Sequence, residues 1–195
     1  MHRRARAGVL ALAVLAVAGC ATVPGNTGQE QAEAIDSLVT RTLADLEKQH
    51  PGVKDTVAAS AGYVILSNKL TKIPLVGVGA GYGVGIETAT GTRTYLRMRR
   101  LDLGAGIGAR AVRPVIVFQD AKKFRDYIDG NFGARIGAEA TAKAGEKGAA
   151  GGGSGGASSE GYRSYLITDT GVSATASLAI VRVKRIKLKS APATP

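Results

Sequence analysis

The sequence contains few of the residues from which catalytic and metal centres are usually built. Its 195 residues include one cysteine, two histidines and no tryptophan. A single cysteine excludes an internal disulfide and a cysteine-based metal cluster. His2 lies in a segment that we expect to be removed, which leaves His50 as the one imidazole. The carboxylates are scattered, so acid–base catalysis lacks an evident pair. We therefore expect no enzymatic activity, no cofactor and no metal; a hydrolase would have to use His50.

Positive charge is what the sequence does have in excess. The net charge is +11 at pH 7, with 26 basic residues. Three arginines precede Cys20, and the part from Cys20 onward keeps 23 basic against 15 acidic residues, a net charge of +8. Such an excess favours anionic partners. The length after Cys20 fits one domain, or one domain with a tail.

The N-terminal segment is typical of an export signal. Basic residues are followed by an apolar run over residues 8–17, which is too short to cross a membrane as a helix. The run ends in Val17-Ala18-Gly19-Cys20. Small residues before a cysteine at such a point resemble the lipobox of bacterial lipoproteins. The resemblance implies that residues 1–19 are a signal peptide and that Cys20 is acylated on its sulfur and its new amino group. An ordinary secretory signal with a stray thiol is the alternative.

The residues after Cys20 indicate a destination and a tether. Ala21, and not aspartate, follows the cysteine, and in this the sequence resembles lipoproteins that are sent on to the outer membrane. We therefore expect the lipid anchor to lie in the inner leaflet of the outer membrane, with the protein facing the periplasm. Residues 22–28 (TVPGNTG) have the composition of a linker. We therefore expect residues 20–28 to be an acylated cysteine and its tether.

Two helices are predicted. Over residues 29–49 the apolar positions lie on one helical face, and Pro51-Gly52 ends the pattern. Its polar face is acidic, so we expect its apolar stripe to dock on the core rather than on a membrane. A shorter helix should follow the N-cap residue Asp120, with an apolar side that comprises Phe124, Tyr127 and Ile128.

Strands are predicted around these helices, two of them rich in glycine. We expect strands over residues 62–66, 76–87, 93–103 and 114–118, with Lys69 and Lys72 on a loop and Gly91 in a turn. Glycine occupies every odd position from 77 to 85, so one face of that strand is bare backbone. The first helix, a facing sheet or a lipid chain should cover it. Residues 104–109 match a loose dinucleotide pattern, but Pro114 excludes the helix that such a site needs.

The C-terminal part is predicted to be loop and hairpin. Residues 133–145 are strand or frayed helix, and the glycine-rich residues 146–160 form a mobile loop. A hairpin should run over residues 162–183, with its turn at Asp169-Thr170-Gly171. The fold class is therefore α+β: a curved, glycine-rich, mostly antiparallel sheet, barrel- or sandwich-like, packed with a long N-terminal helix and a shorter second one.

Basic residues gather in two stretches that are candidates for binding. The stretch 182–189 holds five basic residues in eight, and 93–103 is rich in arginine. An edge strand protected by lysines and a stripe for anionic headgroups both explain the first stretch. Nucleic acid is not expected, because export precludes it and aromatics are not interleaved. On charge density we choose these contacts: Arg97, Arg99, Arg100, Lys184, Arg185 and Lys187.

Taken together, the motifs resemble the SYLF domain, a lipid-binding family. The blocks that carry the resemblance are GVGAGYGVGI (77–86), GAGIGARAVRPVIVFQDAKKFRDYI (104–128), GARIGAEATAKAG (133–145) and the closing segment with serine and tyrosine. The resemblance implies a non-enzymatic domain over residues 29–189, followed by a tail at 190–195, that binds anionic phospholipid headgroups at a membrane. The alternative is a structural envelope lipoprotein whose basic surface binds an acidic protein or polysaccharide.

Overall fold

The fold is an antiparallel sheet with helices on both of its faces. The computed structural model describes residues 22–104, 106–130, 157–159, 161–175 and 178–190. The helices are α2 (Gly28–Gln49), α3 (Val53–Ala58) and α4 (Ala121–Ile128). The strands are β1 (Gly62–Ile73), β2 (Leu75–Glu87), β3 (Arg93–Gly104), β4 (Gly106–Phe118), β5 (Ala157–Ser159), β6 (Tyr162–Thr175) and β7 (Leu178–Arg185). The predicted α+β class with an antiparallel sheet is confirmed. The signal peptide, Cys20, residues 133–145 and most of 146–160 lie outside the described residues.

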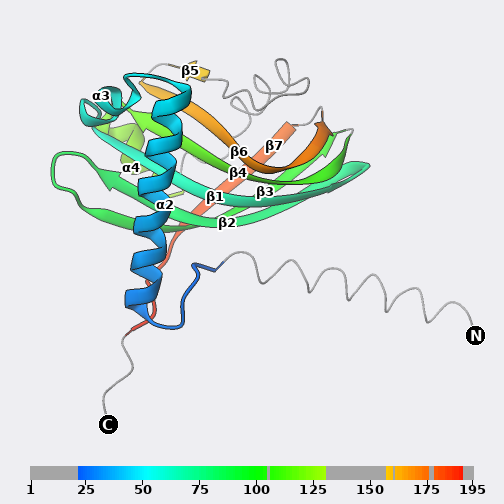
Figure 1. Cartoon of the computed structure of the whole chain (residues 1–195), viewed down its shortest axis with the longest axis horizontal. Coiled ribbons are helices and arrows are strands. Elements are labelled where there is room, and N and C mark those ends of the chain that lie inside the picture. The colour runs from blue at the N-terminus through cyan, green and yellow to red at the C-terminus, as the bar shows by residue number, and fades with distance from the viewer. Residues whose placement is uncertain (1–21, 105, 131–156, 160, 176–177, 191–195) are drawn as a thin grey trace, which may run out of the picture.

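The sheet is open, and its strands follow the order β5-β6-β4-β1-β2-β3-β7 in the described part. The strands are long and visibly curved (Figure 1). β6 and β7 follow each other in the chain but lie at opposite sides of the sheet: β7 is one edge strand, and β6 is flanked at the other edge only by the three residues of β5. Thr175 and Leu178 are three peptide links apart, a span of at most about 11 Å. The curvature therefore brings the two edges close together at this end.

Two apolar cores lie on opposite faces of the sheet. On the face that we call outer, α2 lies across the strands (Figure 1) and buries Ile35, Leu38 and Leu46 against side chains such as Ile65 and Val84. On the inner face, α4 buries its Phe124, Tyr127 and Ile128 in a second cluster. Alternate residues of β1 and β4 serve the two cores, because successive side chains in a strand point to opposite faces.

Both predicted helices form: α2 begins at Gly28, one residue before the expected start, and α4 begins directly after Asp120 as expected. The Thr27 side chain caps α2 by accepting a hydrogen bond from the Glu30 N–H at 3.1 Å, and the Glu30 carboxylate accepts one from the Asn26 N–H. Asp120 caps α4 by accepting from the Lys123 N–H at 2.9 Å. These caps satisfy backbone donors that have no partner inside the helix. None of the described helices is long and apolar enough to cross a membrane.

Three local predictions are wrong. Residues 157–159, expected to be part of the mobile loop, form β5 and pair with β6. Lys69 and Lys72 belong to β1, which continues to Ile73 because each of these residues pairs with β2. The hairpin with its turn at residues 169–171 does not form, because β6 continues through this segment: Thr170 and Gly171 pair with Ala111 and Arg110 of β4, and only a shift of register at Asp169 interrupts the pairing. The return strand is β7, which pairs with β3 instead. The short helix α3 has no counterpart among the sequence predictions.

The bare glycine face of β2 is covered differently from what the sequence suggests. A Cβ at Gly81 or Gly83 would overlap a carbonyl oxygen of β1 itself, so the two strands pack at backbone distance. A Cβ at Gly85 would lie 2.7 Å from the Ile128 side chain of α4. The neighbouring strand and α4 therefore fill this face. Glycine is required there by the close approach of backbone.

Candidate functional site

A cationic hollow lies where both ends of the described chain meet the sheet. Its volume is about 530 Å³. It is lined by Thr22, Val23, Gly25, Gln31, Arg97, Lys184, Arg185, Ile186, Lys187 and Lys189. Half of these residues are basic and none is acidic. A concave site with this lining is suited to an anion that several cations contact together.

The chain ends are fixed around the hollow by Gln31 of α2. Its side-chain oxygen accepts a hydrogen bond from the Lys189 N–H at 2.9 Å. Its side-chain nitrogen donates to the Val23 carbonyl at 3.3 Å and to the Gly25 carbonyl at 3.4 Å. Val23 is buried, so the described part of the predicted linker packs on the domain. One buried amide thus holds the two walls of the hollow.

The register of β3 and β7 sets the cations of the outer face in rows. Arg97 lies opposite Lys184, and Arg99 lies opposite Arg182. Lys69 of β1 is one strand further along in the second row, because it pairs with Ala80, which pairs with Arg99. In the described part of the chain, no carboxylate forms an ion pair with any of these five side chains. The face therefore keeps its positive potential.

Arg97 stands out within the hollow. Its Nε is buried and has no hydrogen-bond partner among the described residues. A guanidinium carries five N–H donors and no acceptor, and a buried donor without a partner costs free energy. Because this donor belongs to a residue of the cationic lining, an anionic oxygen in the hollow is the partner that its chemistry suits.

The structure brings together four of the six basic residues chosen from the sequence. Arg97, Lys184, Arg185 and Lys187 line the hollow. Arg99 is exposed on the same face, one row away. Arg185 also forms an ion pair with Asp129, at 2.5 Å, so its charge is partly neutralised.

Arg100 does not belong to this group. It is 7% exposed and lies on the inner face, next in line after the core residues Leu96 and Met98, and it has a partner of its own. Consecutive strand residues point to opposite faces, so Arg99 and Arg100 cannot share one surface. We therefore leave Arg100 out of the site. Side chains of β7 also alternate between the two faces, so Arg182 shares the outer face with Lys184. Charge density alone had not selected Arg182 as a site residue.

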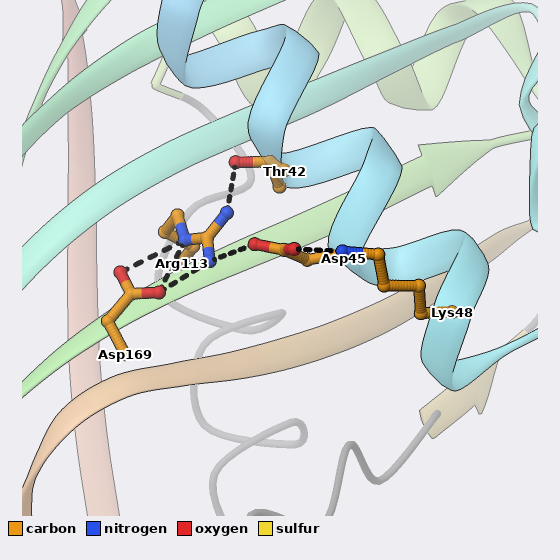
Figure 2. A network of polar contacts seen from close by, with 5 residues as sticks. All are labelled: Thr42, Asp45, Lys48, Arg113 and Asp169. Atoms are coloured by element: carbon orange, nitrogen blue, oxygen red, sulfur yellow. Dashed lines mark hydrogen bonds and ion pairs between the residues drawn. The ribbon is translucent and has the colours of Figure 1, made fainter.

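A second polar cluster joins α2 to the sheet (Figure 2). Arg113 of β4 is buried and donates hydrogen bonds to Thr42 at 3.0 Å and Asp45 at 2.8 Å, both on α2, and to Asp169 of β6 at 2.8 Å. The hydrogen bond from Arg113 is the main reason why the pKa of Asp45 lies below its usual value. A carboxyl group with a lowered pKa is a poor general acid. This cluster is built to hold α2 in place.

The remaining polar groups do not form a recognisable active site in the described residues. The His50 ring packs against Tyr165, with centroids 5.1 Å apart, and its Nε2 has no hydrogen-bond partner there. No group of three or more histidine, cysteine or acidic residues lies close enough to hold a metal within the described ranges. In comparisons with known proteins, no protein-family model and no curated protein matches this chain.

Proposed function

We propose that this chain is a periplasmic lipoprotein of the outer membrane whose domain, without enzymatic activity, binds anionic phospholipid headgroups in the cationic hollow. Membership of the SYLF family and acylation of Cys20 are parts of the proposal. The site residues are Arg97, Lys184, Arg185, Lys187 and Lys189, with Arg99 and Arg182 beside them.

One observation carries the proposal: the hollow holds five basic side chains and no acidic one, and the buried Nε of Arg97 has no partner in the described residues. A phosphate offers the several oxygens that such a lining can contact. Thr22 lines the same hollow and follows Cys20 by two positions, a reach of about 7 Å. A lipid anchor on Cys20 would therefore bring this hollow to the surface of the bilayer.

Vesicle sedimentation tests the proposal. A chain without residues 1–20 retains every described residue. We expect it to sediment with vesicles of phosphatidylcholine and phosphatidylglycerol but not with phosphatidylcholine alone. Binding should be lost at about 1 M salt, where the screening length falls to about 3 Å. Inorganic phosphate as competitor separates a site for any phosphate from one that needs a lipid surface.

Charge reversal locates the site. The double variant Lys184→Glu and Lys187→Glu should weaken binding at least about tenfold, since each basic residue near an anionic surface contributes about 1 kcal/mol. The double variant Lys54→Glu and Arg163→Glu changes the net charge equally at exposed positions outside the hollow, and it should bind much more nearly like the wild type. Equal loss in both variants, or equal binding to neutral vesicles, would contradict the proposal.

The alternative function predicts a different result. An envelope protein that binds an acidic protein or polysaccharide should ignore anionic vesicles and retain one specific partner on purification. The Lys184→Glu and Lys187→Glu variant should then lose that partner.

A further inference from the structure

Exposed apolar side chains gather at one end of the sheet, around the turn between β1 and β2. The large apolar residues that are exposed in the described part of the chain are Ile73 (64%), Leu75 (66%), Val76 (38%), Val78 (41%), Leu101 (38%) and Leu103 (45%). All of them belong to β1, β2 or β3. We call these six residues the apolar end. A contiguous exposed group of this kind marks an interaction surface.

The strand register orders the apolar end into rows on the outer face. Ile73 pairs with Val76, which pairs with Leu103. In the next row Val78 pairs with Leu101. The row after that holds the exposed cations described above, and the following one lies at the hollow. Rows on one face are two residues apart, about 7 Å. Two apolar rows are thus followed directly by two cationic rows.

The turn itself is shaped to present a leucine. Leu75 has a φ angle of 77°, a backbone conformation that residues other than glycine rarely adopt. It costs roughly 1–2 kcal/mol for a residue with a Cβ. The strand that follows uses glycine repeatedly, yet this strained and exposed position carries a large apolar side chain. Strain of this kind is often retained for a function.

We propose that the apolar end inserts into the boundary between headgroups and acyl chains of the membrane. This inference rests on the proposed function, because the same membrane would supply the anionic headgroups for the cationic rows. Side chains on one face of a sheet project in one direction. The hollow that Thr22 shares with Arg97, the cations and the apolar end follow one another along β3 from Arg97 to Leu103, six residue steps or about 20 Å. All three can therefore meet one plane.

The charge pattern favours a bilayer over a second copy of the chain. Interfacial segments bury apolar side chains about 5–10 Å deep, while basic residues remain at headgroup level. The adjacent rows have this arrangement. A second copy docked through the same face would bring its unpaired cations, Arg99 and Arg182 among them, close to those of the first, and like charges oppose such contact.

Single-tryptophan variants test the insertion, because the chain has no tryptophan of its own. In the chain without residues 1–20, Ile73→Trp places the probe in the apolar end. Ala89→Trp places it on the exposed turn between β2 and β3, at the other end of these strands. With vesicles of phosphatidylcholine and phosphatidylglycerol, we expect the emission of Ile73→Trp to shift to shorter wavelength and to be quenched by brominated acyl chains. The emission of Ala89→Trp should not change.

A second variant removes the apolar end without touching a charge. Ile73→Ser with Leu103→Ser should weaken vesicle binding at least about tenfold, because the transfer of one leucine side chain out of water already corresponds to about that factor. The comparison with Lys184→Glu and Lys187→Glu then separates the two contributions. The charge variant loses the initial attraction, and the serine variant loses the acyl-chain contact.

Each other outcome overturns the inference in a recognisable way. If vesicles bind but Ile73→Trp stays in water, the protein contacts headgroups only and the proposed function survives. If the protein does not bind anionic vesicles at all, the proposed function fails as well. A shift without vesicles that grows with protein concentration would indicate a second copy. A shift independent of concentration would indicate cover by the chain itself.

Discussion

Arg97 of β3 and Lys184 of β7 lie directly opposite each other on the outer face of the sheet. Neither has an acidic partner among the described residues. Directly opposed like charges destabilise an antiparallel pair. The free protein therefore sacrifices some stability at this position. A bound anion between the two side chains would remove the repulsion.

Lys184→Glu should therefore stabilise the protein without lipid. An opposite-charge pair across two strands contributes roughly 0.2–1 kcal/mol, so the free energy of unfolding should rise by that amount. Urea unfolding measures this change. Lys187→Glu is the matched control, because Lys187 follows the end of β7 and has no cross-strand partner. It should weaken vesicle binding without the gain in stability. A loss of stability in Lys184→Glu would contradict the repulsion.

The contact between Asp45 and Arg113 should make stability depend on acid pH. The folded protein lowers the pKa of Asp45, chiefly through the hydrogen bond from Arg113. The carboxylate therefore stabilises the fold above its unfolded pKa of about 3.8, and this contribution is lost as the pH falls through the lower, folded value. Asp45→Asn should be less stable than the wild type at pH 7, and the difference should shrink below about pH 4.

Urea unfolding at a series of pH values checks this dependence. Asp55→Asn serves as the control, because Asp55 is exposed on α3 and forms no ion pair among the described residues. Its pH profile should follow that of the wild type. A constant difference between Asp45→Asn and the wild type at every pH would contradict the assignment.

Gly81→Ala should destabilise the sheet severely. The added Cβ would overlap the carbonyl oxygen of Ser67, and backbone cannot move aside as the end of a side chain can. We expect a loss of about 3 kcal/mol, the upper range for overpacking. Gly91→Asn is the comparison, since Gly91 has φ 69° with no atom near its Cβ position, and asparagine tolerates this conformation. Thermal unfolding of the two variants should differ clearly in midpoint.

The sequence carried enough information for the elements whose signals are local. The spacing of Ile35, Leu38 and Leu46 predicts α2, and Asp120 marks the start of α4. The glycine alternation predicts β2. The predicted hairpin was wrong because Asp169-Thr170-Gly171 has the composition of a turn, whereas pairing with the long strand β4 keeps this segment within β6, with only a shift of register at Asp169. Long-range pairing outweighed a local preference there.

The candidate site, too, could be predicted only where its signal is local in the sequence. Charge density selected Arg97, Lys184, Arg185 and Lys187, which the fold does bring together. It also selected Arg100, because density ignores the face on which a strand residue lies. The buried Arg113 had no local signal at all, since its partners Asp45 and Asp169 are 68 and 56 residues away.

The cationic hollow is assembled from residues near the two ends of the described chain, 22–31 and 184–189, with Arg97 of β3 between them. Gln31 can hold its two walls only when β7 has already been added to the edge of the sheet. A chain that has folded only in part, or one that lacks β7, therefore carries the positive charge but does not form the cationic hollow. Adhesion to lipid would in this way be reserved for molecules that have finished folding.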